Sequence, residues 1–240
     1  MQGYRFFITF LLILDIYYSV AQKRPENKYG VAVLFDKNEF FSGVARDSSK
    51  AMVELKQLIP NITYELRYSG RMNFMKKRMY PKNTTYTFLR SPAAAALRLV
   101  QLDLNGRGYA VKVWDAYRPY SVTVDFWELV KDERYVADPA KGSGHNRGIA
   151  VDLTLIELSS GKELDMGTGF DNFTDTAHHD FQNLSPAVLS NRRLLKTTME
   201  KYGFVSFPSE WWHYSLQNSS SFEILDIPFK TLKKVPPIQR

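Results

Sequence analysis

The absence of cysteine limits how this chain can be stabilised. None of its 240 residues is a cysteine, which excludes disulfides, thiolate metal sites and a cysteine-linked bacterial lipid anchor. The folded state must therefore depend on a hydrophobic core. Hydrophobic residues make up 44% of the chain and charged residues 24%, as is typical of globular proteins. The length suits one domain with a large core, and two small domains are also compatible with it.

The N-terminal residues have the pattern of a secretory signal peptide. Arg5 precedes an apolar run over residues 6–20, and Ser-Val-Ala at 19–21 provides the small side chains of a cleavage site. We predict that residues 1–21 are removed and that residues 22–240 form one domain. The apolar run is short and polar for a membrane span. The mature protein is thus predicted to be secreted or periplasmic without stable membrane insertion, the alternative being an uncleaved anchor.

The chain has a formal net charge of +7. A positive charge can attract nucleic acid, anionic lipid or anionic cell-wall polymers. The basic residues are scattered, however, and the one local cluster is Lys76-Lys77-Arg78. Because no basic stripe is interleaved with aromatic residues, we predict no nucleic-acid partner.

Helix and strand signals are mixed along the chain without regular βαβ alternation. This mixture predicts a single α+β domain in which helices pack on an antiparallel sheet. Ser91 before Pro92 and Ser185 before Pro186 are good N-cap signals. We expect helices over 91–104, over 121–131 and from Ser185 to Gly203, and strands over 109–114, 149–155 and 204–207.

The first chemical motif surrounds His145. In a continuous strand, a spacing of seven residues would place His145 and Asp152 on opposite faces. The intervening Asn-Arg-Gly at 146–148 is turn chemistry, which can reverse the chain and let the two side chains converge. Beyond the turn, residues 149–155 alternate, and Asp152 lies on the face opposite the apolar side chains. The motif fits either a metal ligand on a strand or an exposed aspartate on a surface hairpin.

The second motif is Glu210-Trp-Trp-His213-Tyr. Two imidazoles and a carboxylate are a common ligand set for catalytic zinc, which leaves its fourth position to water. His145, Asp152 and His213 would form that set, and Glu210 would accept a proton from the water as a general base. Alternatively, the aromatic residues fill the core and His213 is a buried structural histidine. The sequence His-Glu-X-X-His is absent, which excludes a zincin.

Together the motifs resemble those of a known family. Ser-X-His-X-X-Gly-X-Ala-X-Asp begins at Ser143, and Glu-X-X-His follows about sixty residues after Asp152. This order resembles the zinc D,D-peptidases and most closely the D-alanyl-D-alanine dipeptidases, over roughly residues 62–229. The other matching segments are Leu66-Arg67-Tyr68, Asn73-Phe74, Trp114 to Pro119, Met166 to Asp171, His178-His179 and Asn191-Arg192-Arg193.

The resemblance implies the zinc D,D-peptidase fold, with one zinc ion on the sheet held by His145, Asp152 and His213. It implies that Glu210 is the catalytic base. It also implies that Arg118 steadies the tetrahedral oxyanion, a task suited to a charged group with several donors. A surface salt bridge is the alternative for Arg118.

The resemblance also implies how the substrate is held. Asp171 and Tyr68 would bind its ammonium group, and Ser143 would help to bind its carboxylate. Asp115 is expected to be structural and to orient Arg118.

Some positions carry no transferable function. We expect His178 and His179 to be structural or to support the site indirectly. The segment Ser69-Gly70-Arg71 replaces the usual small residues of the family and could alter the pocket entrance, and Gly169 occupies a variable place.

The implied reaction is zinc-dependent hydrolysis of D-Ala-D-Ala to D-alanine, in the metabolism of cell-wall precursors or peptidoglycan fragments. Charged groups at both substrate termini would restrict the pocket to dipeptides. The enzymatic alternative is a D,D-carboxypeptidase that trims the terminal D-Ala from peptidoglycan stem peptides in a more open pocket. A non-catalytic zinc-binding or wall-binding module is a further alternative, against which Glu210 and Arg118 argue. Export favours salvage of dipeptides derived from the wall.

Overall fold

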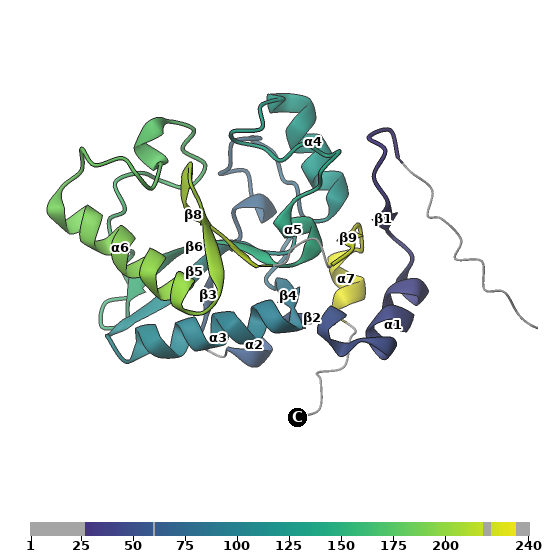
Figure 1. The fold of residues 1–240 in the computed structure, drawn as a ribbon, viewed down its shortest axis with the longest axis horizontal. Coiled ribbons are helices and arrows are strands. Elements are labelled where there is room, and N and C mark those ends of the chain that lie inside the picture. The colour runs from purple at the N-terminus through teal and green to yellow at the C-terminus, as the bar shows by residue number, and fades with distance from the viewer. Residues whose placement is uncertain (1–26, 60, 218–221, 234–240) are drawn as a thin grey trace, which may run out of the picture.

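A computed structural model describes residues 27–59, 61–217 and 222–233. The predicted signal peptide lies outside these residues. A five-stranded sheet with strand order β3-β5-β6-β8-β7 forms the centre of the domain (Figure 1). Its strands are β3 (Thr63–Tyr64), β5 (Tyr109–Asp115), β6 (Ala150–Glu157), β7 (Phe204–Phe207) and β8 (Glu210–Leu216).

The sheet confirms the α+β class and corrects one detail. β5, β6, β8 and β7 pair antiparallel, as expected, but the short edge strand β3 pairs parallel to β5. Parallel neighbours need a crossover connection. Here the chain between β3 and β5 passes through α3 (Ser91–Asn105), which packs against β5.

The main core lies between the sheet and two long helices, α3 and α6 (Pro186–Lys201). Val151, Leu153 and Leu155 of β6 belong to this core, as do Leu97 of α3 and Leu195 of α6. Because side chains alternate along a strand, Asp152 is directed to the opposite face. The burial of one face by helices therefore leaves the other face of β6 for chemistry.

The two predicted N-caps had different outcomes. The side chain of Ser185 accepts a hydrogen bond from the backbone N–H of Val188, so its predicted cap is confirmed. Ser91 is instead the first helical residue, and Arg90 occupies the cap position. The reason is that β4 (Phe88–Arg90) runs directly into α3, and the Ser91 N–H is bonded to the Ala51 carbonyl.

A second core joins the remaining elements beside the sheet. It is centred on Phe40, Phe88, Tyr117, Phe126 and Phe229. The other helices are α1 (Lys37–Arg46), α2 (Leu55–Leu58), α4 (Tyr120–Val130), α5 (Gly144–Arg147) and α7 (Phe229–Leu232), with short 3-10 turns at Ser48–Lys50, Arg67–Ser69 and Asp175–Ala177. The other strands are β1 (Val33–Leu34), β2 (Met52–Glu54) and β9 (Ile224–Leu225).

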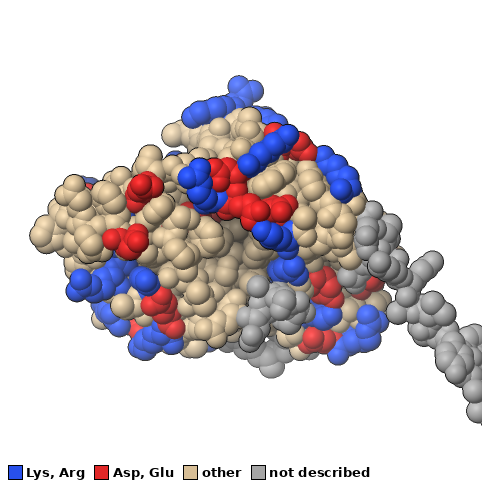
Figure 2. Space-filling model, turned by 45° about the horizontal axis from the view of Figure 1, so that its top comes forward, with Lys and Arg blue, Asp and Glu red and all other residues tan. Residues whose placement is uncertain are grey.

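The described surface carries charges of both signs. On the face shown in Figure 2, lysine and arginine side chains are interspersed with acidic ones. Among the described residues, no helix has both the length and the apolar character needed to cross a membrane.

Candidate active site

A single helical turn positions His145. The Ser143 hydroxyl accepts hydrogen bonds from the N–H groups of His145 and Asn146 at 3.1 and 3.3 Å, and the Asn146 side chain accepts from the Ser143 N–H. This reciprocal arrangement is a capping box that starts α5. Gly148 ends the turn at φ +72°, and a Cβ there would lie 2.7 Å from the side chain of Met52. The expected reversal after His145 is therefore a capped helical turn rather than a simple hairpin turn.

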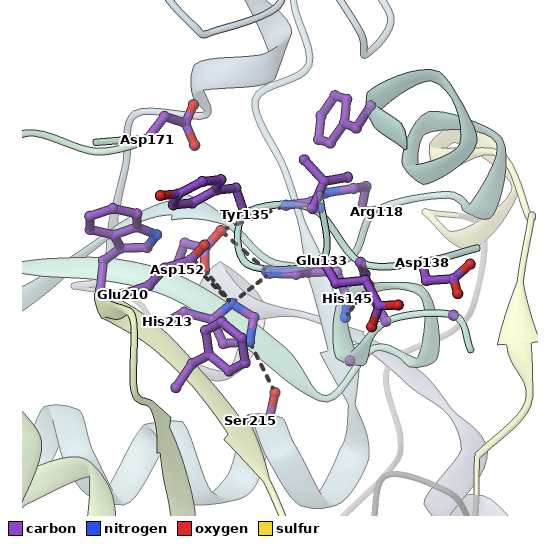
Figure 3. Close-up of a pocket in the computed structure, with 18 of the residues that line it drawn as sticks. Arg118, Glu133, Tyr135, Asp138, His145, Asp152, Asp171, Glu210, His213 and Ser215 are labelled. Carbon is purple, nitrogen blue, oxygen red and sulfur yellow. Dashed lines mark hydrogen bonds and ion pairs between the residues drawn. The ribbon is translucent and has the colours of Figure 1, made fainter. Parts of the chain in front are cut away.

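Strand pairing brings the other two predicted ligands together. Asp152 on β6 is the direct cross-strand partner of His213 on β8. The His213 Nδ1 lies 2.9 Å from Asp152 Oδ1, and the His145 Nε2 lies 3.4 Å from Asp152 Oδ2 and 3.2 Å from His213 Nδ1 (Figure 3). His145 and Asp152 are buried, so the alternative of an exposed hairpin aspartate is wrong.

These three residues fit a zinc ion. Each offers one ligand atom, and the ligand atoms all lie within 4.8 Å of one another. Tetrahedral zinc with ligands at about 2.0–2.1 Å separates neighbouring ligand atoms by about 3.3 Å. The two ring nitrogens lie 3.2 Å apart, close to that value. His213 Nδ1 lies 2.9 Å from Oδ1 of Asp152 and His145 Nε2 lies 3.4 Å from its Oδ2, so either oxygen is near enough to complete the set. The donor set of two nitrogens and one oxygen is also that of catalytic zinc sites.

Hydrogen bonds select the ring nitrogen that each histidine presents. The His145 Nδ1–H donates to the Ala116 carbonyl at 2.6 Å, which leaves the lone pair of Nε2 directed at the group. The His213 Nε2 lies 3.3 Å from the Ser215 hydroxyl, which leaves Nδ1 on the metal side. Such partners orient ligating histidines and fix their tautomers. The sequence analysis missed Ser215, although it lies two residues after His213 in the same strand.

Glu210 begins β8 and lines the same pocket. Its Oε2 lies 3.8 Å from His213 Nδ1. Burial, followed by repulsion from Asp152, raises the pKa of Glu210 well above its usual value. A buried carboxyl group this close to the predicted metal group is placed to take a proton from water and to release it.

Arg118 is held by a buried ion pair. Asp115 Oδ2 accepts hydrogen bonds from the Nε and a terminal nitrogen of Arg118 at 2.9 and 2.8 Å. Its Oδ1 accepts from the Tyr80 hydroxyl, and the guanidinium lies over the rings of Phe126 and Tyr68. The surface salt bridge considered for Arg118 is therefore wrong. Sequence analysis named Asp115 as its orienting partner but missed Tyr80.

The Asp115–Arg118 pair should stabilise the fold strongly. Asp115→Ala would leave a buried guanidinium without the carboxylate that it contacts through two nitrogens, so we expect the free energy of unfolding to fall by about 3–5 kcal/mol. The matched control is Asp132→Ala, which removes an ion pair with the exposed Arg134 and should cost less than about 1 kcal/mol. Urea unfolding of both variants measures the difference. Equal losses would show that the buried pair has no special importance.

Asp171 offers an unpartnered oxygen in the same pocket. Its Oδ1 accepts a hydrogen bond from the Tyr68 hydroxyl at 2.9 Å. Its Oδ2 is buried and has no hydrogen-bond partner among the described residues. Asp171 also has φ +58°, a left-handed backbone that side chains rarely adopt outside sites where the surroundings impose it. Burial raises the pKa of Asp171 to about 7. A buried oxygen of this kind calls for a donor from a ligand.

A buried arginine holds the loop that carries Asp171. The guanidinium of Arg192 on α6 donates to the carbonyls of Met166, Thr176 and His178 at 2.7, 2.8 and 3.1 Å. These carbonyls lie on both sides of Asp171 in the chain. Arg192 thus explains part of the Asn191-Arg192-Arg193 motif, to which the sequence analysis assigned no function.

The pocket itself has a volume of about 310 Å³. It brings together all eight predicted site residues, including Ser143, whose hydroxyl oxygen also caps α5. Residues 69–71 are not among its lining residues, so their expected effect on the entrance has no support here. The lining residues that the sequence analysis missed include Phe126, Glu133, Tyr135, Asp138, Lys141, Phe207 and Ser215.

The adjacent histidines lie outside this pocket. The ring of His179 packs edge-on against the ring of Tyr214, with centroids 5.9 Å apart. Burial lowers the pKa of His179 to about 4. The His178 carbonyl accepts from Arg192. Neither histidine lines the pocket, and their expected structural function stays a prediction.

Comparison with known proteins gives a consistent result. A family model described as D-ala-D-ala dipeptidase matches residues 48–233. The D-alanyl-D-alanine dipeptidase of Escherichia coli (strain K12) is 34% identical over 174 residues, which cover 72% of this chain and 89% of that protein. Those of Enterococcus faecalis and Streptomyces coelicolor are each 31% identical, covering 68% and 67% of this chain and 89% of each relative. The chain therefore belongs to the D-Ala-D-Ala dipeptidase family of metallopeptidases.

Proposed function

We propose that this protein hydrolyses D-Ala-D-Ala to two molecules of D-alanine with one zinc ion as cofactor. The unpartnered Oδ2 of Asp171, in the pocket that holds His145, Asp152 and His213, is the observation that carries this proposal. A free dipeptide has an ammonium group close to its single peptide bond, so one small pocket can bind both.

In this mechanism, water adds to the carbonyl carbon of the peptide bond, and the carbon–nitrogen bond then breaks. When bound, zinc supplies a Lewis acid that polarises the carbonyl and lowers the pKa of water. Glu210 takes the proton from the attacking water and delivers it to the leaving amine. Arg118, held by Asp115, donates to the oxyanion that develops on the carbonyl oxygen.

The substrate termini would be held by charged and polar groups. The ionised Asp171 attracts the ammonium group, and the Tyr68 hydroxyl fixes the orientation of that carboxylate. The Ser143 hydroxyl lines the pocket and has a hydrogen available to donate to the substrate carboxylate. A stem peptide would present a neutral amide where Asp171 requires a cation, which favours a dipeptidase over a D,D-carboxypeptidase. If residues 1–21 direct export, the substrate would be dipeptide released from the cell wall.

The direct test is hydrolysis of D-Ala-D-Ala, L-Ala-L-Ala and N-acetyl-D-Ala-D-Ala by the zinc-loaded protein, measured by release of alanine. We expect D-Ala-D-Ala to be cleaved with a kcat/KM at least about 100-fold above that of the acetylated dipeptide, which lacks the ammonium group. In Asp171→Asn this ratio should fall below about 10. Equal cleavage of both peptides by the unaltered protein would contradict the assigned function of Asp171.

The titration of Asp171 predicts a pH dependence of KM. Because burial raises the pKa of Asp171 to about 7, its carboxyl group is protonated in acid and ionised above neutrality. The KM for D-Ala-D-Ala should therefore fall as the pH rises through about 7, and rise again when the substrate amino group loses its proton near pH 8. The acidic limb of this profile should be absent in Asp171→Asn. An unchanged limb in that variant would assign the titration to another group.

A further inference from the structure

Three loops that are far apart in the sequence meet beside Asp171. The segments 70–79, 131–143 and 171–174 contribute Phe74, Tyr135 and Phe173 respectively. The rings of Tyr135 and Phe173 are stacked, with centroids 4.8 Å apart and an angle of 28°. Phe74 packs edge-on against Phe173 at 5.3 Å. We call these three residues the aromatic bridge.

The contacts place the aromatic bridge at one end of the pocket. Phe173 lies two residues after Asp171, and Phe74 contacts the ring of Tyr68, whose hydroxyl is bonded to Asp171. Phe74 and Tyr135 also line the pocket directly. Figure 3 shows Tyr135 on the Asp171 side of the pocket, with Glu133 and Asp138 on the opposite side. The bridge therefore lies beside the proposed ammonium site.

A second contact holds the same loop in place. The Ser209 hydroxyl, in the turn between β7 and β8, donates to the Arg134 carbonyl at 3.3 Å. The loop that carries Tyr135 is thus tied to the strand pair that carries Glu210 as well as to Phe173. The two contacts are made by adjacent residues, so they hold this part of the loop in place beside the pocket.

The bridge leaves little room for a longer substrate. Each additional residue of an extended peptide needs about 3.5 Å. Two stacked rings with centroids 4.8 Å apart have no space for a peptide between them. The pocket volume of about 310 Å³ is also near the lower end of the usual range for ligand sites.

We propose that the aromatic bridge determines substrate length: it closes the pocket beyond Asp171 and so excludes peptides extended at the amino end. This inference rests on the proposed function and adds a steric criterion to the charge criterion of Asp171. A tripeptide keeps an ammonium group, but the third residue would have to occupy the position of the Tyr135 and Phe173 rings.

The test compares D-Ala-D-Ala with a tripeptide that ends in D-Ala-D-Ala, in the full zinc-loaded chain. We expect Tyr135→Ala and Phe173→Ala each to raise the ratio of tripeptide to dipeptide kcat/KM by at least about 10-fold. Tyr135→Phe keeps the ring and should leave the ratio unchanged. Phe41→Ala, which removes one ring of the distant Phe40–Phe41 pair, controls for a general loss of stability. Because either alanine breaks the same ring stack, the double variant should raise this ratio only slightly more than each single variant does.

The outcomes separate the two proposals. The aromatic bridge does not set the substrate length if the unaltered chain cleaves the tripeptide and the dipeptide with equal kcat/KM. The same holds if the ratio of tripeptide to dipeptide kcat/KM is unchanged in folded Tyr135→Ala and Phe173→Ala. If the unaltered chain cleaves neither peptide, the proposed function is wrong. The bridge is then judged by calorimetric binding of both peptides to the zinc-loaded protein: preference for the dipeptide, lost in the alanine variants, supports it, and equal or undetectable binding overturns it.

Discussion

Glu210→Gln is expected to lower kcat for D-Ala-D-Ala by about 10²–10⁴-fold while the protein keeps its zinc. Glutamine has nearly the shape of glutamate but cannot take a proton from water or return one to the leaving amine. Glu210 is not one of the three grouped ligands, which explains why the metal should remain. Steady-state kinetics and metal content by atomic absorption measure the two quantities.

A matched variant separates proton transfer from general charge effects. Glu133 lines the same pocket, but it is exposed and forms an ion pair with Lys141. Glu133→Gln should therefore change kcat by less than about 10-fold. If Glu210→Gln retains most of the activity, another group must act as the base.

Asp152→Ala is expected to abolish both zinc binding and hydrolysis. Asp152 contributes the one carboxylate of the ligand set, and its two oxygens contact both histidines. Without it, two imidazoles cannot hold zinc in the geometry of a catalytic site. The activity of this variant should fall to the background rate. Complete chelation should abolish the activity of the unaltered protein in the same way, and added zinc should restore it.

Thermal unfolding gives a readout that does not depend on activity. Zinc at about 100 times its dissociation constant stabilises a folded protein by about 2.7 kcal/mol. For a domain of this size, the midpoint should rise by about 5–10 °C. The shift should be absent in Asp152→Ala and present in Asp138→Ala, an aspartate that lines the pocket outside the ligand group. A zinc-dependent shift that persists in Asp152→Ala would refute the ligand assignment.

Local patterns in the sequence predicted much of the site. The residue types and spacing of His145, Asp152 and His213 predicted the group of possible metal ligands that the structure brings together. Glu210 as the base stays a prediction. The alternation in β6 placed Asp152 opposite the apolar side chains, and this holds because α3 and α6 cover one face of the sheet. The N-cap at Ser185 was predictable for a similar reason, since one side chain satisfies a nearby backbone donor.

Features that depend on contacts between residues far apart in the sequence could not be predicted from local patterns. The parallel pairing of β3 with β5 and the displaced cap at Ser91 both follow from contacts with segments far along the chain. The bond from Tyr80 to Asp115 joins residues 35 positions apart. Such contacts leave no periodic signal in the sequence around either partner.

The sequence by itself identified the candidate residues for the chemistry, because motif spacing and residue type limit which side chains can form a zinc site and supply a general base. The tertiary structure alone decided which nitrogen each histidine presents, how Arg118 is held and which rings meet beside Asp171. These depend on the Ala116 carbonyl, on a buried carboxylate and on rings from three loops. The physical reason is that hydrogen bonds and ring contacts act over a few ångströms in space, whereas sequence patterns report mainly on neighbours along the chain.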